Sequence, residues 1–379
     1  MSAKPFTIAV PQAKLDAIAA RVRAFPWFPA PAGEQWEYGI NTAYLKELCA
    51  YWLERYDWRA CEAALNAYPQ FIVTLEGLDV HFVHVRGEGG AAARPIILTH
   101  GWPGSHYEFW GAIEKLAFPS RFGGEAKDAF DVIVPSLPGY GFSGKPAKPL
   151  GQRATARLWN VLMTETLGYP RYIAQGGDWG ARVTGLLGYE HSACVGVHLN
   201  MNGMRPVDMT PRSEEERVWL AAMRKALAAE SGYMHEQSTK PQTLAMALMD
   251  SPVGAAAWIV EKFHGWGDVR EGLEAAFSKD QLLTNVMLYL VTDSMATSIW
   301  YYRAFLDEAF NPPARIETPT GIANFKGEGV FKMAPRSWLE RIYNIAHWSD
   351  FERGGHFAAM ERPDDLVGDV RAFARTICY

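Results

Sequence analysis

The sequence has few cysteines and no strong excess of charge of either sign. Its 379 residues include four cysteines, and no two of them have the CxxC spacing that is typical of zinc or redox sites. Free thiols in a reducing compartment are therefore expected instead of a disulfide framework. The net charge of −5 is mild and spread along the chain. It therefore gives no indication of nucleic acid or an anionic membrane as a binding partner. The cysteines are Cys49, Cys61, Cys194 and Cys378.

Two further absences concern secretion and membranes. The first residues, MSAKPFTIAVPQAKLD, lack the apolar core of a signal peptide. No uninterrupted apolar run approaches the roughly 20 residues that a membrane-spanning helix needs. The sequence therefore predicts no membrane span and a cytoplasmic location.

The composition is that of a folded protein, with 49% hydrophobic, 13% aromatic and 21% charged residues. The length allows one large core with additional units. The changes in pattern along the chain predict an N-terminal extension at 1–70, a core at 71–205, a helical lid at 206–315 and a second part of the core at 316–379.

Hydrophobic patterning predicts strands that alternate with helices in the core. Buried strands are expected at 95–99, 132–135, 172–175 and 195–199, after a hairpin at 71–85. Apolar strands separated by helices are typical of a mostly parallel sheet with helices on both faces.

Helical segments dominate the extension and the region after about residue 205. Strands resume at 320–325 and 342–346, so the helices between form an insertion that can act as a lid. Ser213 and Glu216 fit a capping box at its start. The longest helical stretches are expected at 11–25, 42–57, 241–263 and 279–309.

The stretch YIAQGGDWG at 172–180 resembles a nucleophile elbow, the sharp strand-to-helix turn that exposes one side chain above a sheet. Glycines flank the exposed position because a Cβ atom there would clash. The position usually holds serine, but here it holds Asp178. A carboxylate is suited to displacing a leaving group from saturated carbon, which gives an ester on the enzyme.

The loop HGWPGS at 100–105 directly follows the first buried strand. In chains with a nucleophile elbow, this loop and the residue after the nucleophile each give one backbone N–H to an oxyanion hole. The expected donors are the N–H groups of Trp102 and Trp179. His100 is interpreted as a structural residue of the loop.

A base and an orienting acid are expected late in the chain, in the order nucleophile, acid, histidine. His356 lies in RGGHF after the last strand, and the glycines before it are interpreted as room for its ring to move. Its expected role is to deprotonate water. Glu328, in a short loop after a late strand, is the expected acid; Asp350 is the competitor, which a flanking strand should carry elsewhere.

The chain resembles the epoxide hydrolases of the α/β-hydrolase superfamily, and most closely the microsomal-type branch. The resemblance covers nearly the full length, including the N-terminal extension. It rests on HGWPGSHYEFW (100–110), PSLPGYGFS (135–143), QGGDWG (175–180), SGYMHEQSTKP (231–241), DSPVGAAAWIVEKF (250–263), LLTNVMLYL (282–290) and RGGHFAAMERP (353–363).

The resemblance implies the α/β-hydrolase fold and an aspartate nucleophile, Asp178, with His356 as base and Glu328 as acid. It also implies two lid tyrosines that bind the epoxide oxygen, Tyr233 and Tyr302, with Tyr301 left as a competitor for the second. A small apolar epoxide and water are the expected substrates, no metal or organic cofactor is expected, and a homodimer is left open. The membrane anchor of some members is not carried over.

Two other functions share these residues. A haloalkane or haloacid dehalogenase uses the same aspartate, but it would need halide-binding donors in the lid instead of a tyrosine pair. A binding protein without catalysis would not need the complete set of nucleophile, acid and base. Epoxide hydrolysis to a vicinal diol through an aspartyl ester is therefore the predicted function.

Overall fold

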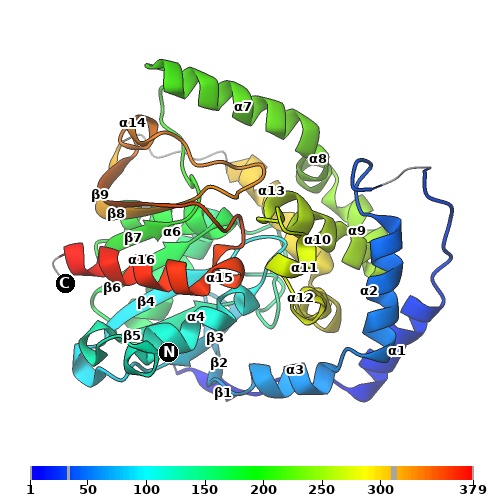
Figure 1. The fold of residues 1–379 in the computed structure, drawn as a ribbon. Coiled ribbons are helices and arrows are strands. Elements are labelled where there is room, and N and C mark those ends of the chain that lie inside the picture. The colour runs from blue at the N-terminus through cyan, green and yellow to red at the C-terminus, as the bar shows by residue number, and fades with distance from the viewer. Residues whose placement is uncertain (1, 32–34, 309–313, 378–379) are drawn as a thin grey trace.

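The computed structural model describes residues 2–31, 35–308 and 314–377. Within them a nine-stranded sheet has the order β1-β2-β3-β5-β4-β6-β7-β8-β9 (Figure 1). Every neighbouring pair from β5 to β9 is parallel, and the first three strands join antiparallel. The predicted α/β class with a mostly parallel sheet is confirmed.

Most strand bounds lie within two residues of the predictions, but β8 begins at Ile316 instead of 320, β9 extends to Phe351 instead of 346, and one strand was not predicted. That strand, β1, is too short to show a periodicity. The strands are β1 (Lys4–Phe6), β2 (Gln70–Leu75), β3 (Leu78–Val85), β4 (Arg94–Thr99), β5 (Phe130–Pro135), β6 (Tyr172–Gly176), β7 (Cys194–Leu199), β8 (Ile316–Phe325) and β9 (Tyr343–Phe351).

Alternate strand residues point to opposite sides of the sheet. Both faces carry apolar side chains, and helices cover both of them. Ile96 and Leu98 of β4 belong to one core cluster, whereas Ile97 between them belongs to the other. On the first face α4 (Trp110–Ala117) and α16 (Pro363–Thr376) pack together, and on the second α5 (Gln152–Val161) packs on α6 (Asp178–Glu190) (Figure 1).

The lid lies between β7 and β8 and consists of helices. Two stretches predicted as continuous helices are each broken into two. Pro252 is the first residue of the second helix of the first pair. The break falls just before it because proline disfavours helical geometry in the preceding residue. The lid helices are α7 (Glu214–Glu230), α8 (Gly232–Thr239), α9 (Pro241–Asp250), α10 (Pro252–Trp266), α11 (Leu273–Ala276), α12 (Lys279–Val291) and α13 (Met295–Glu308).

The predicted capping box at the start of α7 is only half formed. The Ser213 side chain accepts from the backbone N–H of Glu216, as predicted. The Glu216 carboxylate instead accepts from the N–H of Arg212 and pairs with Arg341. A complete capping box occurs at Ser278 and Gln281, where α12 begins.

The N-terminal extension packs on the lid as well as on the sheet. It contains α1 (Gln12–Arg23), α2 (Thr42–Glu54) and α3 (Trp58–Leu65), so the helix predicted at 42–57 ends at residue 54. In Figure 1 these helices run along one side of α9 and α12. Lys14 forms an ion pair with Asp293, and the Tyr51 hydroxyl donates to Asp280 at 2.9 Å. The extension therefore contacts α12 near both of its ends, at Asp280 in its first turn and at Asp293 in the turn that follows it.

The remaining helices are short and belong to the second part of the core. They are α14 (Arg336–Leu339) and α15 (Ala358–Glu361). Among the described residues no single helix has the length and apolarity of a membrane span, although α9 with α10, and α12 with α13, reach that length and composition as strongly bent pairs. Cys49, Cys61 and Cys194 are free thiols, and Cys378 lies outside the described residues.

Burial of α2 provides a test of this arrangement. Leu48 is fully buried, whereas Met246 on α9 is 64% exposed. Leu48→Ala should lower the free energy of unfolding by about 2–5 kcal/mol, because it removes apolar contacts and leaves a cavity. Met246→Ala should change it by less than about 0.5 kcal/mol. Urea unfolding followed by tryptophan fluorescence measures both, and equal stabilities would contradict the buried position of α2.

Candidate active site

The turn between β6 and α6 presents Asp178 above the carboxyl end of the sheet. Asp178 has φ 48°, a left-handed conformation that non-glycine residues rarely adopt. The flanking glycines are required by contact: a Cβ atom on Gly176 would lie 2.4 Å from the backbone of Gly180, and one on Gly180 would lie 1.8 Å from the Thr99 carbonyl oxygen. The local sequence therefore forces the strained turn, and the turn exposes the carboxylate.

The loop after β4 packs directly on this carboxylate. The backbone N–H of Trp102 donates to Asp178 Oδ1 at 2.9 Å. Trp179 follows Asp178 in the first turn of α6, where backbone N–H groups have no acceptor within the helix. The loop is held from the lid, because Asn285 donates to the Pro103 carbonyl at 2.7 Å and Tyr289 to that of Gly104 at 2.6 Å.

His100 has structural contacts only. Its Nδ1 lies 3.0 Å from the Gly101 carbonyl, and its Nε2 accepts from the backbone N–H of Leu137 at 3.1 Å. Burial lowers the pKa of His100 to about 4, so the ring is neutral at pH 7. It ties the loop after β4 to the loop after β5.

The structure brings the predicted base and acid to Asp178. His356 Nε2 lies 3.3 Å from Asp178 Oδ2, and His356 Nδ1 lies 2.8 Å from Glu328 Oε2. The other oxygen of Glu328 accepts from the backbone N–H groups of Val330 and Phe331. These bonds fix the carboxylate, which in turn fixes the imidazole.

Asp350, the competing acid, does not reach His356. It lies on β9 and accepts from the Asn324 side chain at 2.7 Å. The flanking strand carries it away from the site, as expected.

The charge of His356 depends on its two carboxylate neighbours. Burial opposes the charged ring, but Glu328 and Asp178 outweigh burial and raise the pKa of His356 to about 10. In the ligand-free protein at pH 7 the ring is therefore an imidazolium. Loss of the charge on Asp178 would remove one of the two groups that hold this proton.

Two lid tyrosines lie beside Asp178. Tyr233 of α8 and Tyr302 of α13 line the same cavity as Asp178, with ring centroids 5.7 Å apart. Burial, reinforced by the negative charge of Asp178, raises the pKa of both phenols well above the ordinary value. Tyr301 points elsewhere, because its hydroxyl donates to Thr155 at 2.8 Å. Of the two competitors, Tyr302 is the one that faces the cavity.

The cavity has a volume of about 390 Å³ and a mostly apolar wall. Methionine is the commonest residue type in that wall, and its flexible thioether adapts to irregular shapes. Trp179 and Trp219 also contribute to it. The methionines are Met201, Met204, Met209, Met223 and Met234.

A further ionisable group beside the site, Glu108, was missed from the sequence. The carboxyl of Glu108 packs against Gly104, where a Cβ atom would come within 1.4 Å of Oε1. Burial raises the pKa of Glu108 to about 8, with His356 opposing the shift and Asp178 reinforcing it. At pH 7 Glu108 is mostly neutral, so it adds little negative charge beside the nucleophile. Glu108 is the single acidic residue of the motif HGWPGSHYEFW at 100–110, and this was the available signal.

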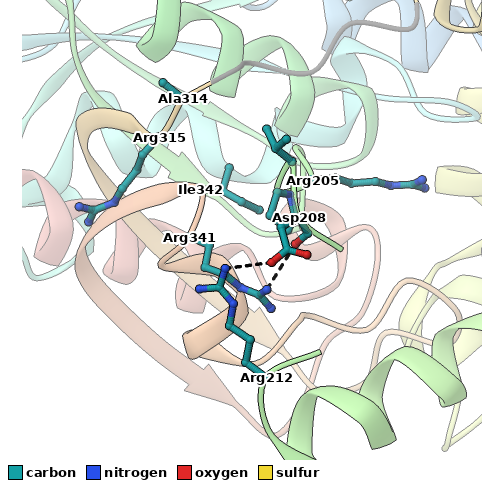
Figure 2. A pocket seen from close by; sticks show the side chains of 9 residues that line it. Arg205, Asp208, Arg212, Ala314, Arg315, Arg341 and Ile342 are labelled. Carbon is teal, nitrogen blue, oxygen red and sulfur yellow. Dashed lines mark hydrogen bonds and ion pairs between the residues drawn. The ribbon is translucent and has the colours of Figure 1, made fainter. Parts of the chain in front are cut away.

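A second cavity, of about 340 Å³, lies outside this centre and has a different character. Figure 2 shows arginine side chains around Asp208. Arg212 pairs with the Asp208 carboxylate at 3.0 Å, and Arg341 donates to the backbone carbonyl of Asp208 at 3.3 Å. In this second cavity, Arg212 and Arg341 are therefore both bound to Asp208. Across the described ranges, no group of three or more His, Cys, Asp or Glu side chains could hold a metal ion.

Two family models match the chain. The model described as Epoxide hydrolase N terminus matches residues 3–109, and the alpha/beta hydrolase fold model matches residues 94–220. The first match runs past the predicted extension into β4 and the loop that follows it. Both elements that position the nucleophile are thus within matched residues.

Similarity to individual proteins extends over the full chain. Epoxide hydrolase 1 of Sus scrofa is 37% identical, covering 98% of this chain and 88% of that protein. The structure of Aspergillus niger epoxide hydrolase superposes with a TM-score of 0.87 at 35% identity, over 100% of this chain and 97% of that one. Juvenile hormone epoxide hydrolase from Bombyx mori gives a TM-score of 0.87 at 31% identity, over 98% and 94%. With this identity over nearly its whole length, and the α/β-hydrolase fold with a helical lid, the chain belongs to the epoxide hydrolases.

Proposed function

We propose that this epoxide hydrolase opens its substrate through a covalent ester on Asp178. The observation that carries the proposal is the position of this carboxylate between the Trp102 N–H at 2.9 Å and His356 Nε2 at 3.3 Å, in a cavity shared with two phenols. Oδ1 is held by a backbone donor, so Oδ2 is the oxygen that bonds to the epoxide carbon.

In the first half-reaction, Oδ2 attacks a ring carbon and the carbon–oxygen bond of the epoxide breaks. The departing oxygen needs a proton, and the phenols of Tyr233 and Tyr302 can supply it because their raised pKa values keep them protonated. The product is a hydroxyalkyl ester of Asp178. Its formation removes the negative charge that helped to hold the proton on His356.

Between the two half-reactions, the proton of the His356 imidazolium passes to the tyrosinate left by ring opening, which restores the phenol and leaves the imidazole neutral. In the second half-reaction, neutral His356 takes a proton from water. The resulting hydroxide attacks the ester carbonyl carbon, and negative charge develops on Oδ1. The N–H groups of Trp102 and Trp179 stabilise that charge. The bond between the carbonyl carbon and Oδ2 then breaks as the His356 imidazolium gives its proton to Oδ2, which leaves in the diol. The acid proton left on Asp178 passes to His356, so the carboxylate, now carrying one water oxygen, and the imidazolium are both restored.

The cavity supports an apolar epoxide as substrate. Its wall is mostly apolar, and the methionines allow it to adapt to the bound molecule. One similar protein is a juvenile hormone epoxide hydrolase by name, so juvenile hormone is one candidate substrate to test.

The alternative reaction, dehalogenation, would use the same aspartate. The two buried phenols favour the epoxide, because an alkoxide leaving group needs a proton and a halide does not. Comparing released diol with released halide for matched substrates separates the two activities.

A single turnover in oxygen-labelled water tests the ester route. The first diol should carry no label, because its new oxygen is Oδ2, and the label should appear in a peptide that contains Asp178. Mass spectrometry of both products measures this. Label in the diol of the first turnover would instead indicate direct attack by water.

His356→Gln should trap the ester. The variant keeps the nucleophile but lacks the base, so hydrolysis of the ester should slow by about 10²–10⁴-fold. Intact-protein mass should increase by the mass of one whole epoxide. The double variant with Asp178→Ala should gain no mass, and an adduct on that protein would assign the nucleophile elsewhere.

The pKa of His356 also predicts a pH dependence of stability. The folded protein binds this proton more tightly than the unfolded chain, because the pKa rises from 6.5 to about 10 on folding. The contribution of His356 is therefore complete below pH 6.5 and is lost as pH rises to about 10. The difference in unfolding free energy between the wild type and His356→Gln should shrink across this window. Parallel curves for the two proteins would rule out the imidazolium.

A further inference from the structure

One lid carbonyl binds both loops of the catalytic pair. α10 ends at Trp266, and its carbonyl oxygen accepts from the backbone N–H of His356 at 3.2 Å and from that of Gly329 at 3.3 Å. Gly329 follows Glu328 directly. The base loop and the acid loop are therefore attached to the same point of the lid.

The carboxylate of Glu361 holds the residues on either side of the base. Its Oε1 accepts from the N–H of Phe357 at 2.9 Å, and its Oε2 accepts from that of Gly355 at 2.9 Å. Oε2 also accepts from the N–H of Asp268, in the lid loop after α10, at 2.7 Å. One side chain thus fixes the backbone before and after His356 and joins it to the lid.

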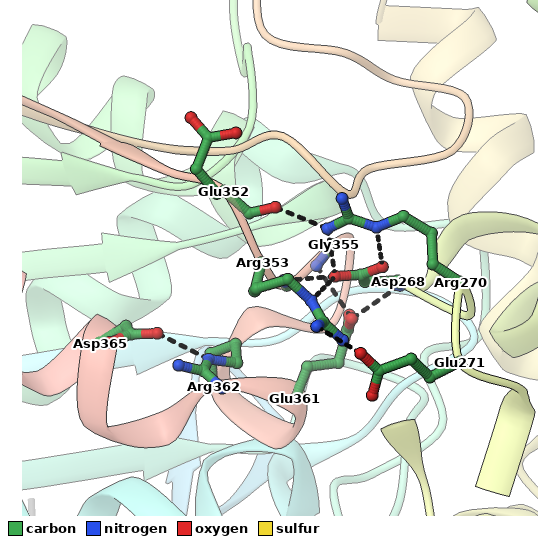
Figure 3. A network of polar contacts seen from close by, with 10 residues as sticks. Asp268, Arg270, Glu271, Glu352, Arg353, Gly355, Glu361, Arg362 and Asp365 are labelled. Carbon is green, nitrogen blue, oxygen red and sulfur yellow. Dashed lines mark hydrogen bonds and ion pairs between the residues drawn. The ribbon is translucent and has the colours of Figure 1, made fainter. Parts of the chain in front are cut away.

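Asp268 strengthens the same junction with its side chain. Figure 3 shows its carboxylate between the guanidinium groups of Arg270 and Arg353. Arg270 binds it through two hydrogen bonds of 2.6 and 2.7 Å, and the backbone N–H of Gly354 donates to it at 2.9 Å. These donors hold the pKa of Asp268 well below its usual range, with Arg270 the largest contributor.

This packing corrects the interpretation of the glycines before His356. They do not leave room for the ring to move. A Cβ atom on Gly355 would lie 2.8 Å from the backbone nitrogen of Asp268 and 2.9 Å from the Trp266 carbonyl oxygen. The glycine is needed because the lid backbone lies directly against the base loop.

We infer that Glu361 is a positioning residue for His356, and that Asp268 and the Trp266 carbonyl complete a junction through which the lid sets the base for ester hydrolysis. Glu361 acts through the backbone of residues 355–357 and does not touch the nucleophile. The inference rests on the proposed function, in which His356 acts as a base only in the second half-reaction. Loss of the junction should therefore affect the two half-reactions unequally.

Glu361→Gln tests this with little change in volume. An amide has one acceptor oxygen, so its NH₂ group must face at least one of the three backbone donors and that hydrogen bond is lost. Decay of the ester should slow by about 10–100-fold, because small displacements of a catalytic group reduce rates by this order. The rate of ester formation should stay within about twofold of the wild type. Rapid quenching with intact-mass detection of the ester gives both rates.

Glu271→Gln is the matched control. Glu271 belongs to the same charged cluster, but its carboxylate is 64% exposed and pairs with Arg353. Both half-reactions should keep their wild-type rates in this variant. If Glu361→Gln does not fold, Asp268→Asn provides the same comparison, because it keeps the side-chain shape while weakening the bonds to Gly354 and Arg353.

The outcomes are distinguishable. Slow ester decay with normal ester formation supports the positioning role. Equal slowing of both steps, or no slowing of either, overturns it, since a general distortion or an irrelevant contact would give those results. A wild-type protein that forms no ester, together with a His356→Gln protein that traps none, refutes the proposed function itself.

Discussion

A buried positive ring between two carboxylates organises the catalytic centre. His356 connects Glu328, in the loop after β8, with Asp178 at the start of α6. Three segments that are far apart in the sequence therefore meet in one short chain of polar contacts. The cost of burying these charges is offset only while all three are present and correctly oriented. The surrounding structure accordingly fixes each of them through backbone hydrogen bonds.

The same arrangement explains how one histidine suits two stages of the proposed reaction. Between two carboxylates its proton is held firmly, so it does not compete for protons while Asp178 is ionised. Esterification makes Asp178 neutral and leaves one carboxylate beside the ring. The environment thus changes the basicity of His356 at the stage that needs a base. No movement of the backbone is required for this change.

Much of the fold and the centre followed from the sequence because the signals were local. The turn at Asp178 needs small residues at fixed spacing, and the buried strands are short apolar runs. The single-turn break after α12 was not predicted, because Asp293 adopts its left-handed conformation (φ 52°) without a proline or glycine to indicate it. Glu361 was not singled out either. Its partners are backbone N–H groups of the loop just before it and of the distant lid loop at Asp268, and such partners leave no pattern of side chains.

The contacts between the extension and the lid mean that the chain does not divide cleanly at residue 70. α1 packs against α10 and α12, and α2 packs against α12. Leu45, Leu48 and Trp52 of α2 are buried and belong to the same core cluster as the lid. A shortened protein that began at β2 would present apolar helix surfaces to water and would replace the three-residue edge strand β1 with the longer edge of β2. Both features promote aggregation. The smallest unit that can fold stably therefore includes its first helices, of which α1 and α2 support the lid from the side away from β6, the strand that leads into Asp178 (Figure 1).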